Sequence, residues 1–157
     1  MYCLDTDNIV QEYCYTQNKG WYNGGIGTFG AKATPAAGLA AIVFDAKTPH
    51  SGGVVSIHVF FQGEDRLPPY AARVLKYLAA AETGQILELI YDGFEGSWVR
   101  GQMHIEEPID ATGLAAVAYH TQSQRQIRVY YQNRDLSLRE WCYTDGDWYP
   151  GQLIASV

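Results

Sequence analysis

The sequence predicts an all-β fold built from a repeated antiparallel sheet. A phrase occurs three times, from Glu12, Glu88 and Glu140: an acid, an aromatic residue three positions later, a tryptophan eight to ten positions after the acid, and a glycine three positions beyond it. The 157 residues include 12 Tyr, 4 Trp, 5 Phe and 16 Gly, which is typical of half-buried strands joined by tight turns. Short apolar segments precede the second and third copies in the same order. Such an internal repeat indicates that one structural unit is used several times.

The last copy predicts a unit of four strands. Four segments with strand character follow one another, at 113–119, 126–132, 138–143 and 148–154. The dipeptide Asp145-Gly146 between the last two is of the kind that closes hairpins. Four sequential antiparallel strands make one blade of a β-propeller, so residues 110–157 are expected to form a blade.

The other two copies predict one complete blade and one partial blade. The middle copy has the same order of segments, at 38–44, 56–62 and 85–92, so a second blade is expected at 36–105. Nine residues lead from Cys3 to Glu12, as from Tyr131 to Glu140, which places the N-terminal residues within a second strand. Residues 1–28 are therefore expected to be a partial blade, and residues 1–157 a single partial propeller domain.

The middle blade carries an insertion between its second and third strands. His58 and Glu88 lie 30 positions apart, whereas the corresponding Arg128 and Glu140 lie 12 apart. Within the extra length, Pro68-Pro69 precede apolar residues at helical spacing, and proline is favourable at a helix start. We expect a short helix near 67–82 that projects from the hairpin.

Composition excludes several classes of function. The net charge is −6 and the Lys and Arg residues are scattered, so nucleic acid is not an expected partner. No apolar stretch is long enough to span a bilayer, and no signal peptide is recognisable, which predicts a soluble protein that is cytoplasmic or released by a non-classical route. Three cysteines without metal-ligand spacing predict buried thiols and neither a metal nor a cofactor.

The repeated acid is the feature that points to chemistry. Charges on edge strands often serve only to prevent strand pairing, which is the plainest explanation of such residues. In the last blade, however, Arg128 and Glu140 belong to neighbouring strands and can lie side by side. A guanidinium donates and a carboxylate accepts, so together they can hold adjacent hydroxyls of a polyol while an aromatic ring takes its C–H face. This combination is typical of a sugar site.

The segments 127–132, 138–143 and 147–151 resemble the fungal fucose-specific lectin family of the Aleuria aurantia lectin type. The resemblance covers nearly the whole chain apart from 63–84. It implies a six-bladed β-propeller with fucose sites between adjacent blades and with neither metal, cofactor nor catalytic activity. In such sites an Arg on the second strand and a Glu on the third bind hydroxyls, while aromatic residues of the following blade stack on the sugar. The implied partners are fucosylated glycans or glycoproteins.

Carried over by position, the resemblance assigns eleven carbohydrate-binding residues in this sequence. The hydroxyl-binding positions are Arg128 and Glu140, His58 and Glu88, and Glu12; the stacking positions are Tyr15 and Trp21, Tyr91 and Trp98, and Tyr143 and Trp148. The pocket of His58 and Glu88 receives its walls from Tyr143 and Trp148 in the same chain. Because imidazole offers fewer donors than guanidinium, this pocket is expected to bind more weakly than one with arginine.

Two alternatives to a fucose lectin stay open, and so does the assembly. A structural or protein-interaction propeller with degenerate sugar sites is compatible with His58 at an arginine position. A glycoside hydrolase could use Asp92, Asp145 or the repeated acids, but hydrolysis needs two carboxyl groups about 5–9.5 Å apart, and the repeat places one acid in each pocket. Two blades and a partial one do not close a ring, so a homodimer that completes a propeller is expected, unless the chain is a shortened gene product.

Overall fold

The computed structural model describes residues 1–46, 54–64, 83–93, 95–105, 107–121 and 124–156. The described part of the chain consists of strands and one short 3-10 helix, η1 (Ile26–Phe29), so the predicted all-β fold is confirmed. The helix expected near 67–82 falls outside the described residues. None of the helices in these ranges is long and apolar enough to cross a membrane.

The strands form three antiparallel sheets, in which each strand pairs with its neighbour in sequence. Sheet I contains β1 (Tyr2–Leu4), β2 (Val10–Thr16) and β3 (Gly20–Asn23). Sheet II contains β4 (Leu39–Ala46), β5 (Val54–Glu64), β6 (Thr83–Asp92) and β7 (Ser97–Ile105). Sheet III contains β8 (Leu114–Thr121), β9 (Gln124–Gln132), β10 (Leu138–Thr144) and β11 (Asp147–Ala155). The strand segments expected from the sequence in sheets II and III agree with these bounds to within two residues at each end.

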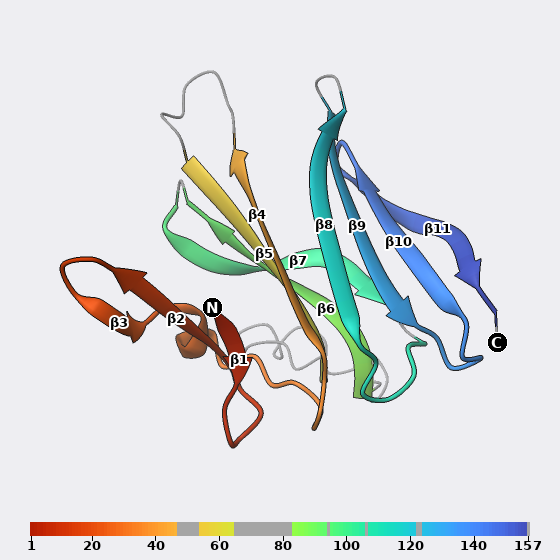
Figure 1. Cartoon of the computed structure of the whole chain (residues 1–157), viewed down its shortest axis with the longest axis horizontal. Coiled ribbons are helices and arrows are strands. Elements are labelled where there is room, and N and C mark those ends of the chain that lie inside the picture. The colour runs from red at the N-terminus through yellow and green to blue at the C-terminus, as the bar shows by residue number, and fades with distance from the viewer. Residues whose placement is uncertain (47–53, 65–82, 94, 106, 122–123, 157) are drawn as a thin grey trace, which may run out of the picture.

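The sheets succeed one another across the molecule, with sheet II in the middle (Figure 1). The first strands of sheets II and III, β4 and β8, are in contact. The hairpin between β10 and β11 turns at Asp145 and Gly146, which both have positive φ, 50° and 116°. Two central residues with positive φ match the right-handed twist of the flanking strands, which explains the dipeptide seen in the sequence.

The core lies between the sheets. Residues of sheets II and III form one buried cluster, which consists of Ile42, Phe60, Ile86, Met103, Ile105, Ile127, Val129 and Tyr131. A second cluster joins sheet II to sheet I and η1, and consists of Val10, Ile26, Ala33, Val59, Phe61, Leu87 and Leu89. Side chains alternate between the two faces of a strand, so Phe60 points to sheet III while its neighbours Val59 and Phe61 point to sheet I. Sheet II is therefore apolar on both faces.

The two contacts between sheets are geometrically equivalent. Tyr2 of sheet I meets Trp98 of sheet II edge to face, with ring centroids 6.1 Å apart and an interplanar angle of 82°. Phe60 of sheet II meets Trp148 of sheet III in the same way, at 6.1 Å and 83°. Each repeated tryptophan therefore packs against the preceding sheet where one is present. The sequence repeat thus determines how one sheet packs on the next as well as the structure of each sheet.

Candidate functional site

Each repeated glutamate lies against a repeated glycine that is in the adjacent strand or, for Gly24, directly follows it. A Cβ atom at Gly24, Gly101 or Gly151 would come within 2.0, 2.0 and 2.5 Å of the Oε2 atom of Glu12, Glu88 and Glu140, respectively. None of these three glycines has a positive φ, so the requirement is for space and not for backbone conformation. We call this arrangement the glycine notch: a missing side chain on the last strand of the sheet, or in sheet I directly after it, that receives the carboxylate of the preceding strand.

The glycine notch coincides with an irregularity in the strand pairing of sheets II and III. The register of β6 with β7 shifts between Leu87 and Leu89, on either side of Glu88. The register of β10 with β11 shifts between Arg139 and Trp141, on either side of Glu140. Such bulges interrupt the regular ladder and can redirect a side chain, which here allows the carboxylate to approach the backbone of the neighbouring strand.

In sheet I, Glu12 is held by hydrogen bonds on both oxygens. Tyr2 lies opposite Glu12 in the ladder, and its hydroxyl donates to Oε1 over 2.8 Å. The backbone N–H of Gly25 donates to Oε2 over 3.0 Å. Burial, followed by the hydrogen bond to Glu12, raises the pKa of Tyr2, which therefore stays a donor. Trp98 of the following sheet contacts Tyr2 and lies 5.5 Å from Tyr91 between ring centroids.

In sheet II, Glu88 forms a buried pair with His58. The distance from His58 Nδ1 to Glu88 Oε1 is 2.5 Å, and the two side chains are 7 and 1 % exposed. The backbone N–H of Met103 donates to Glu88 Oε2 over 3.3 Å. An ionised carboxylate accepts only, so Nδ1 of His58 serves as the donor in this pair when Glu88 is ionised. The phenyl ring of Phe60 lies opposite Glu88 in the ladder, where sheets I and III have a tyrosine.

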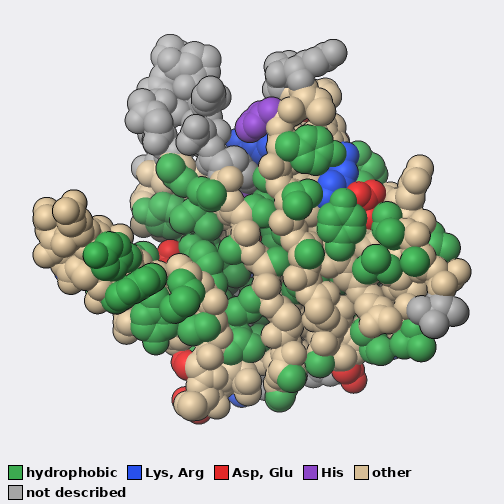
Figure 2. Space-filling view, in the orientation of Figure 1, with side chains coloured by type: hydrophobic (Ala, Val, Ile, Leu, Met, Phe, Trp, Pro, Cys, Tyr) green, Lys and Arg blue, Asp and Glu red, His purple; other side chains and the backbone are tan. Residues whose placement is uncertain are grey.

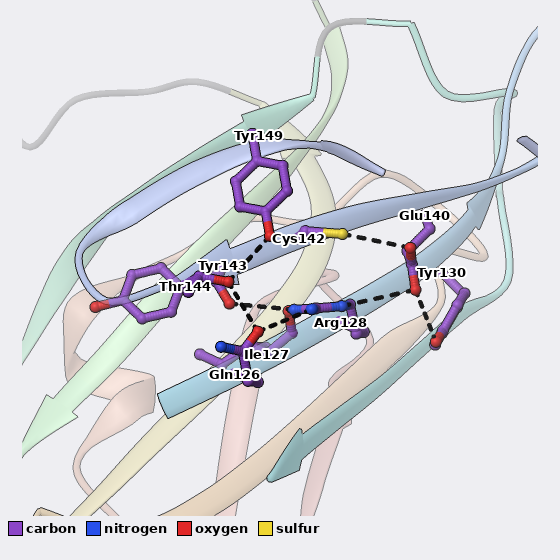
Figure 3. Close-up of polar contacts among 9 residues, drawn as sticks. All are labelled: Gln126, Ile127, Arg128, Tyr130, Glu140, Cys142, Tyr143, Thr144 and Tyr149. Atoms are coloured by element: carbon purple, nitrogen blue, oxygen red, sulfur yellow. Dashed lines mark hydrogen bonds and ion pairs between the residues drawn. The ribbon is translucent and has the colours of Figure 1, made fainter. Parts of the chain in front are cut away.

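In sheet III, Glu140 lies in a larger polar network (Figure 3). The Tyr130 hydroxyl donates to Oε1 over 3.0 Å, and the Cys142 thiol donates to Oε2 over 3.3 Å. Burial is the main cause, and the hydrogen bond to Glu140 the second cause, that raises the pKa of Cys142 to about 11. The same two causes raise the pKa of Tyr130. Cys142 is buried, as expected from the sequence, whereas Cys3 and Cys14 are half-buried.

The guanidinium of Arg128 lies beside Glu140 but is largely engaged within its own sheet. Its Nε is 3.8 Å from Glu140 Oε1, and the two side chains are 16 and 17 % exposed. Its other nitrogens donate to the carbonyls of Ile127 and Tyr143 and to Gln126 Oε1, over 2.8, 3.2 and 2.8 Å (Figure 3). Arg128 faces Cys142 in the ladder, so its approach to Glu140 is diagonal. These contacts fix the side chain and occupy three of its donors.

A cavity of about 440 Å³ lies between sheets II and III. His58 and Glu88 line it from sheet II, and Tyr143 and Trp148 line it from sheet III, so the structure brings together the four residues that the sequence placed in one pocket. The two aromatic rings lie 5.3 Å apart between centroids with an interplanar angle of 59°. The remaining lining residues are Ser56, Ile90, Arg100, Gly101, Gln102, Arg125 and Gly146.

Sequence reasoning missed the polar residues of this cavity that the repeat does not share. Arg100 and Arg125 have no counterpart of the same type in the other copies, whereas Gln102 follows Gly101 as Gln152 follows Gly151. A signal for Arg125 would have come from its place two positions before Ile127 on β9, which puts it on the face of sheet III toward sheet II.

The two outer faces of the molecule carry the remaining predicted residues. On sheet I, Tyr15 and Trp21 are 60 and 63 % exposed, whereas the equivalent Trp98 and Trp148 are half-buried against a preceding sheet. The rings of Tyr15 and Trp21 lie 5.4 Å apart between centroids, in the same arrangement as the equivalent pairs of the other sheets. At the opposite end, Arg128, Tyr130 and Glu140 lie on the face of sheet III that points away from sheet II.

Comparisons with known proteins agree with these features. Residues 68–157 match the family model of the fungal fucose-specific lectin. The chain is 28 % identical over 157 residues to a fucose-specific lectin of Aleuria aurantia, and 28 % identical over 153 residues to one of Aspergillus fumigatus. The two alignments include 100 and 96 % of this chain but 42 and 40 % of the relatives. The chain therefore spans about two fifths of the length of these relatives.

Solved structures show the same relationship. The chain resembles the six-bladed β-propeller of the Aleuria aurantia lectin with a TM-score of 0.72 and 26 % identity, over 99 % of this chain and 42 % of that one. A structure of that lectin with α-methyl-L-fucoside matches with a TM-score of 0.71. A fucose lectin from Kordia zhangzhouensis shares the fold at 23 % identity and a TM-score of 0.66, over all of this chain and 90 % of that one. The chain is thus a partial propeller in its fold.

The glycine notch predicts that Gly101→Ala destabilises the protein. The new methyl group would overlap the Glu88 carboxylate, and overpacking of this kind costs about 1–3 kcal/mol. In a protein of this size that loss lowers Tm by about 2–4 °C per kcal/mol, measurable by calorimetry or by circular dichroism. Gly113→Ala is the matched control, because a Cβ there meets open space and the φ of Gly113 is not positive. Equal Tm values for the two variants would contradict the notch.

Proposed function

We propose that this chain, which belongs to the fungal fucose-specific lectin family, binds L-fucose of fucosylated glycans or glycoproteins in the cavity between sheets II and III. One observation carries the proposal: His58, Glu88, Tyr143 and Trp148 line one cavity. The fucose specificity named for the two curated relatives supports the choice of sugar. In this proposal the three sheets are the blades of the partial propeller.

The chemistry of the cavity suits a deoxyhexose. Glu88, fixed by His58 and by the Met103 N–H, offers acceptor lone pairs to sugar hydroxyls without moving. Tyr143 and Trp148 offer ring faces and edges to the C–H groups of the sugar and to its methyl group. A preorganised carboxylate and rigid aromatic rings reduce the entropic cost of binding.

The proposed activity is binding without catalysis. Glycoside hydrolysis needs two carboxyl groups about 5–9.5 Å apart across one bond. Among the described residues that line the cavity, Glu88 is the one acid, and the other repeated acids belong to different sheets. This distribution favours a lectin over a hydrolase.

A protein-interaction propeller is the second candidate, and one observation favours it. Arg128 already donates three hydrogen bonds within sheet III, so the Arg128 and Glu140 pair offers a ligand fewer donors than a free guanidinium would. Under this alternative the inter-sheet positions serve packing alone, and fucosides do not bind.

We further propose that two copies pair through their outer faces. The outer face of sheet III, with Arg128, Tyr130 and Glu140, has no aromatic residues of a following sheet beside it. In the pair, the exposed Tyr15 and Trp21 of the second copy would take that place. The two internal contacts are the template for this pairing. In each, the ring of Tyr2 or Phe60 meets the tryptophan of the following sheet edge to face. In a pair, Trp21 would meet Tyr130 of the second copy, and additional fucose sites would arise there.

Calorimetry with methyl α-L-fucoside tests the fucose proposal. Glu88→Gln keeps the shape of the side chain but removes the charge that strengthens its hydrogen bonds to hydroxyls, which are worth about 1.5–3 kcal/mol each, so affinity at this site should fall about tenfold or more. Glu107→Gln, the same change at an exposed acid outside the cavity, is the control and should bind as the unaltered protein does. His58→Arg should raise affinity by a similar factor, because guanidinium adds donors. Absence of any fucoside binding by the unaltered protein would refute the proposal in favour of the interaction propeller.

Sedimentation tests the pairing. The unaltered protein should sediment as a dimer, and Trp21→Lys should yield monomers because it places a charge where an indole packs edge to face. Leu136→Lys, which changes a 45 % exposed residue in the turn between β9 and β10, should leave the dimer intact. A stable, folded monomer at micromolar concentration would contradict pairing without affecting the proposal for the cavity between sheets II and III.

A further inference from the structure

A second cavity, of about 450 Å³, lies between sheets II and III, and we call it the Trp141 cavity. The residues that line it are His104, Ile105, Glu107, Tyr131, Asn133, Arg139 and Trp141. None of these lines the cavity proposed to bind fucose. That cavity takes Tyr143 from the end of β10, whereas this one takes Arg139 from its beginning, four residues or about 13 Å away along the strand. The two cavities are therefore separate.

Sheet III supplies most of the chemistry of the Trp141 cavity. Arg139 lies opposite Tyr131 in the ladder, and Trp141 is two positions further along β10, so all three side chains are on the face toward sheet II. His104 lies opposite Leu87, which packs toward sheet I, so the imidazole of His104 points to the other face of sheet II. The cavity is therefore argued without that imidazole.

The indole of Trp141 presents a hydrogen-bond donor without a partner. Its Nε1 is buried and is one of two such side-chain atoms in the described part of the chain that make no hydrogen bond. Buried polar groups are hydrogen-bonded as a rule, and an indole can only donate. The Trp141 N–H thus requires an acceptor that the described residues do not supply.

Two further groups of the lining can both donate and accept hydrogen bonds. These are the side-chain amide of Asn133 and the phenol of Tyr131. Burial is the main cause that raises the pKa of Tyr131; Arg139 lowers this pKa, and Asp135 and Glu107 raise it. The phenol therefore stays protonated and remains able to donate.

Packing between the sheets does not explain the polar residues of this cavity. Counted from the repeated glutamate, the positions of Arg139 and Trp141 are occupied in sheet II by Leu87 and Leu89. Both leucines are buried in the cluster that joins sheet II to sheet I. Two leucines are thus sufficient to pack one sheet on the preceding one, and sheet III has a guanidinium and an indole in their place.

The charges around the Trp141 cavity favour a neutral ligand. The Nη2 atom of Arg139 donates to Asp135 Oδ2 over 2.7 Å, and its Nε donates to Ser137 Oγ over 2.9 Å, so this cation is already compensated. Glu107 adds an exposed carboxylate to the lining. In the view of Figures 1 and 2, β9 ends at the lower side of the molecule, where the visible charged side chains are mostly acidic. An anion would meet these carboxylates, and a cation could not accept from the indole.

We infer that the Trp141 cavity binds a neutral pyranose, as a second carbohydrate site that differs in composition from the repeated one. A hydroxyl group both donates and accepts, so one sugar can accept from the Trp141 N–H and donate to the Glu107 carboxylate. The rings of Tyr131 and Trp141 offer apolar surface to its C–H groups. The volume is in the range of small-molecule sites. This inference goes beyond the proposed fucose binding and does not depend on it.

Nuclear magnetic resonance of the four tryptophan indole groups tests this inference. In protein labelled with ¹⁵N each indole N–H gives one signal, and Trp141→Phe identifies the signal of Trp141. Methyl α-L-fucoside is added first, to fill the proposed fucose cavity. Methyl glycosides of glucose, galactose, mannose and N-acetylglucosamine are then titrated to about 50 mM, because a single-sugar site with few hydrogen bonds binds at roughly millimolar Kd. At least one glycoside should move the Trp141 signal downfield until it saturates, while the Trp148 signal stays where the fucoside left it.

Two variants remove one hydrogen-bonding group each from the lining. Asn133→Ala and, separately, Tyr131→Phe should each weaken this titration about threefold to tenfold. Asn18→Ala, at an exposed residue in the turn between β2 and β3, is the matched control and should bind the glycoside as the unaltered protein does. All three variants should bind methyl α-L-fucoside unchanged, because none of these residues lines the fucose cavity. Circular dichroism establishes that each variant is folded.

Three results would overturn the inference. The first is a Trp141 signal that none of the glycosides moves. The second is movement of the Trp148 signal alone, which would mean that the glycoside entered the fucose cavity. The third is an affinity that both Asn133→Ala and Tyr131→Phe leave equal to that of Asn18→Ala. Each of these leaves the fucose proposal standing, whereas a saturable Trp141 shift in a protein that does not bind the fucoside would refute the fucose proposal and support this one.

Discussion

The carboxylate of the repeated glutamate in its glycine notch is the interaction that builds the site. A glutamate on the strand before the last could point to solvent, but the absent side chain at Gly24, Gly101 or Gly151 lets it lie against the neighbouring backbone. One oxygen is then held by a backbone N–H or a thiol, while the other meets a tyrosine hydroxyl, an imidazole or a guanidinium. A buried carboxylate is tolerated only with such partners, so the notch fixes both the position of the acid and the direction in which it offers its lone pairs.

The arrangement of the sheets converts this local feature into a site. Because sheet II packs apolar residues on both faces, each sheet presents its acid toward the aromatic residues of the next. The equivalence of the Tyr2–Trp98 and Phe60–Trp148 contacts shows that the step between sheets is constant. The equivalent steps place Glu12 and Glu88 each on the face toward the next sheet, and in the proposed pair the outer faces would supply the two halves of one further contact.

Much of this could be predicted from the sequence, because the repeat records what the sheets have in common. The strands follow from comparing the copies, the turn follows from the dipeptide Asp145-Gly146, and the grouping of Glu88 with Trp148 follows from the resemblance to the lectin family. Two features could not be obtained in this way. Gly101 belongs to the repeated phrase, but its role in admitting a carboxylate depends on a bulge visible only in three dimensions. The engagement of Arg128 by the carbonyls of its own sheet depends on its rotamer.

A crystal structure of the chain soaked with methyl α-L-fucoside would test the notch and the inter-sheet cavity together. We expect one sugar between sheets II and III, with its hydroxyls within hydrogen-bonding distance of Glu88 and its C–H face or methyl group against Tyr143 or Trp148. Glu88 should keep its contact with the Met103 N–H, since the notch positions the acid before the sugar arrives. A bound sugar that touches neither Glu88 nor these aromatic residues would show that the notch does not build a fucose site. A soak at saturating fucoside that leaves only water in this cavity would show the same.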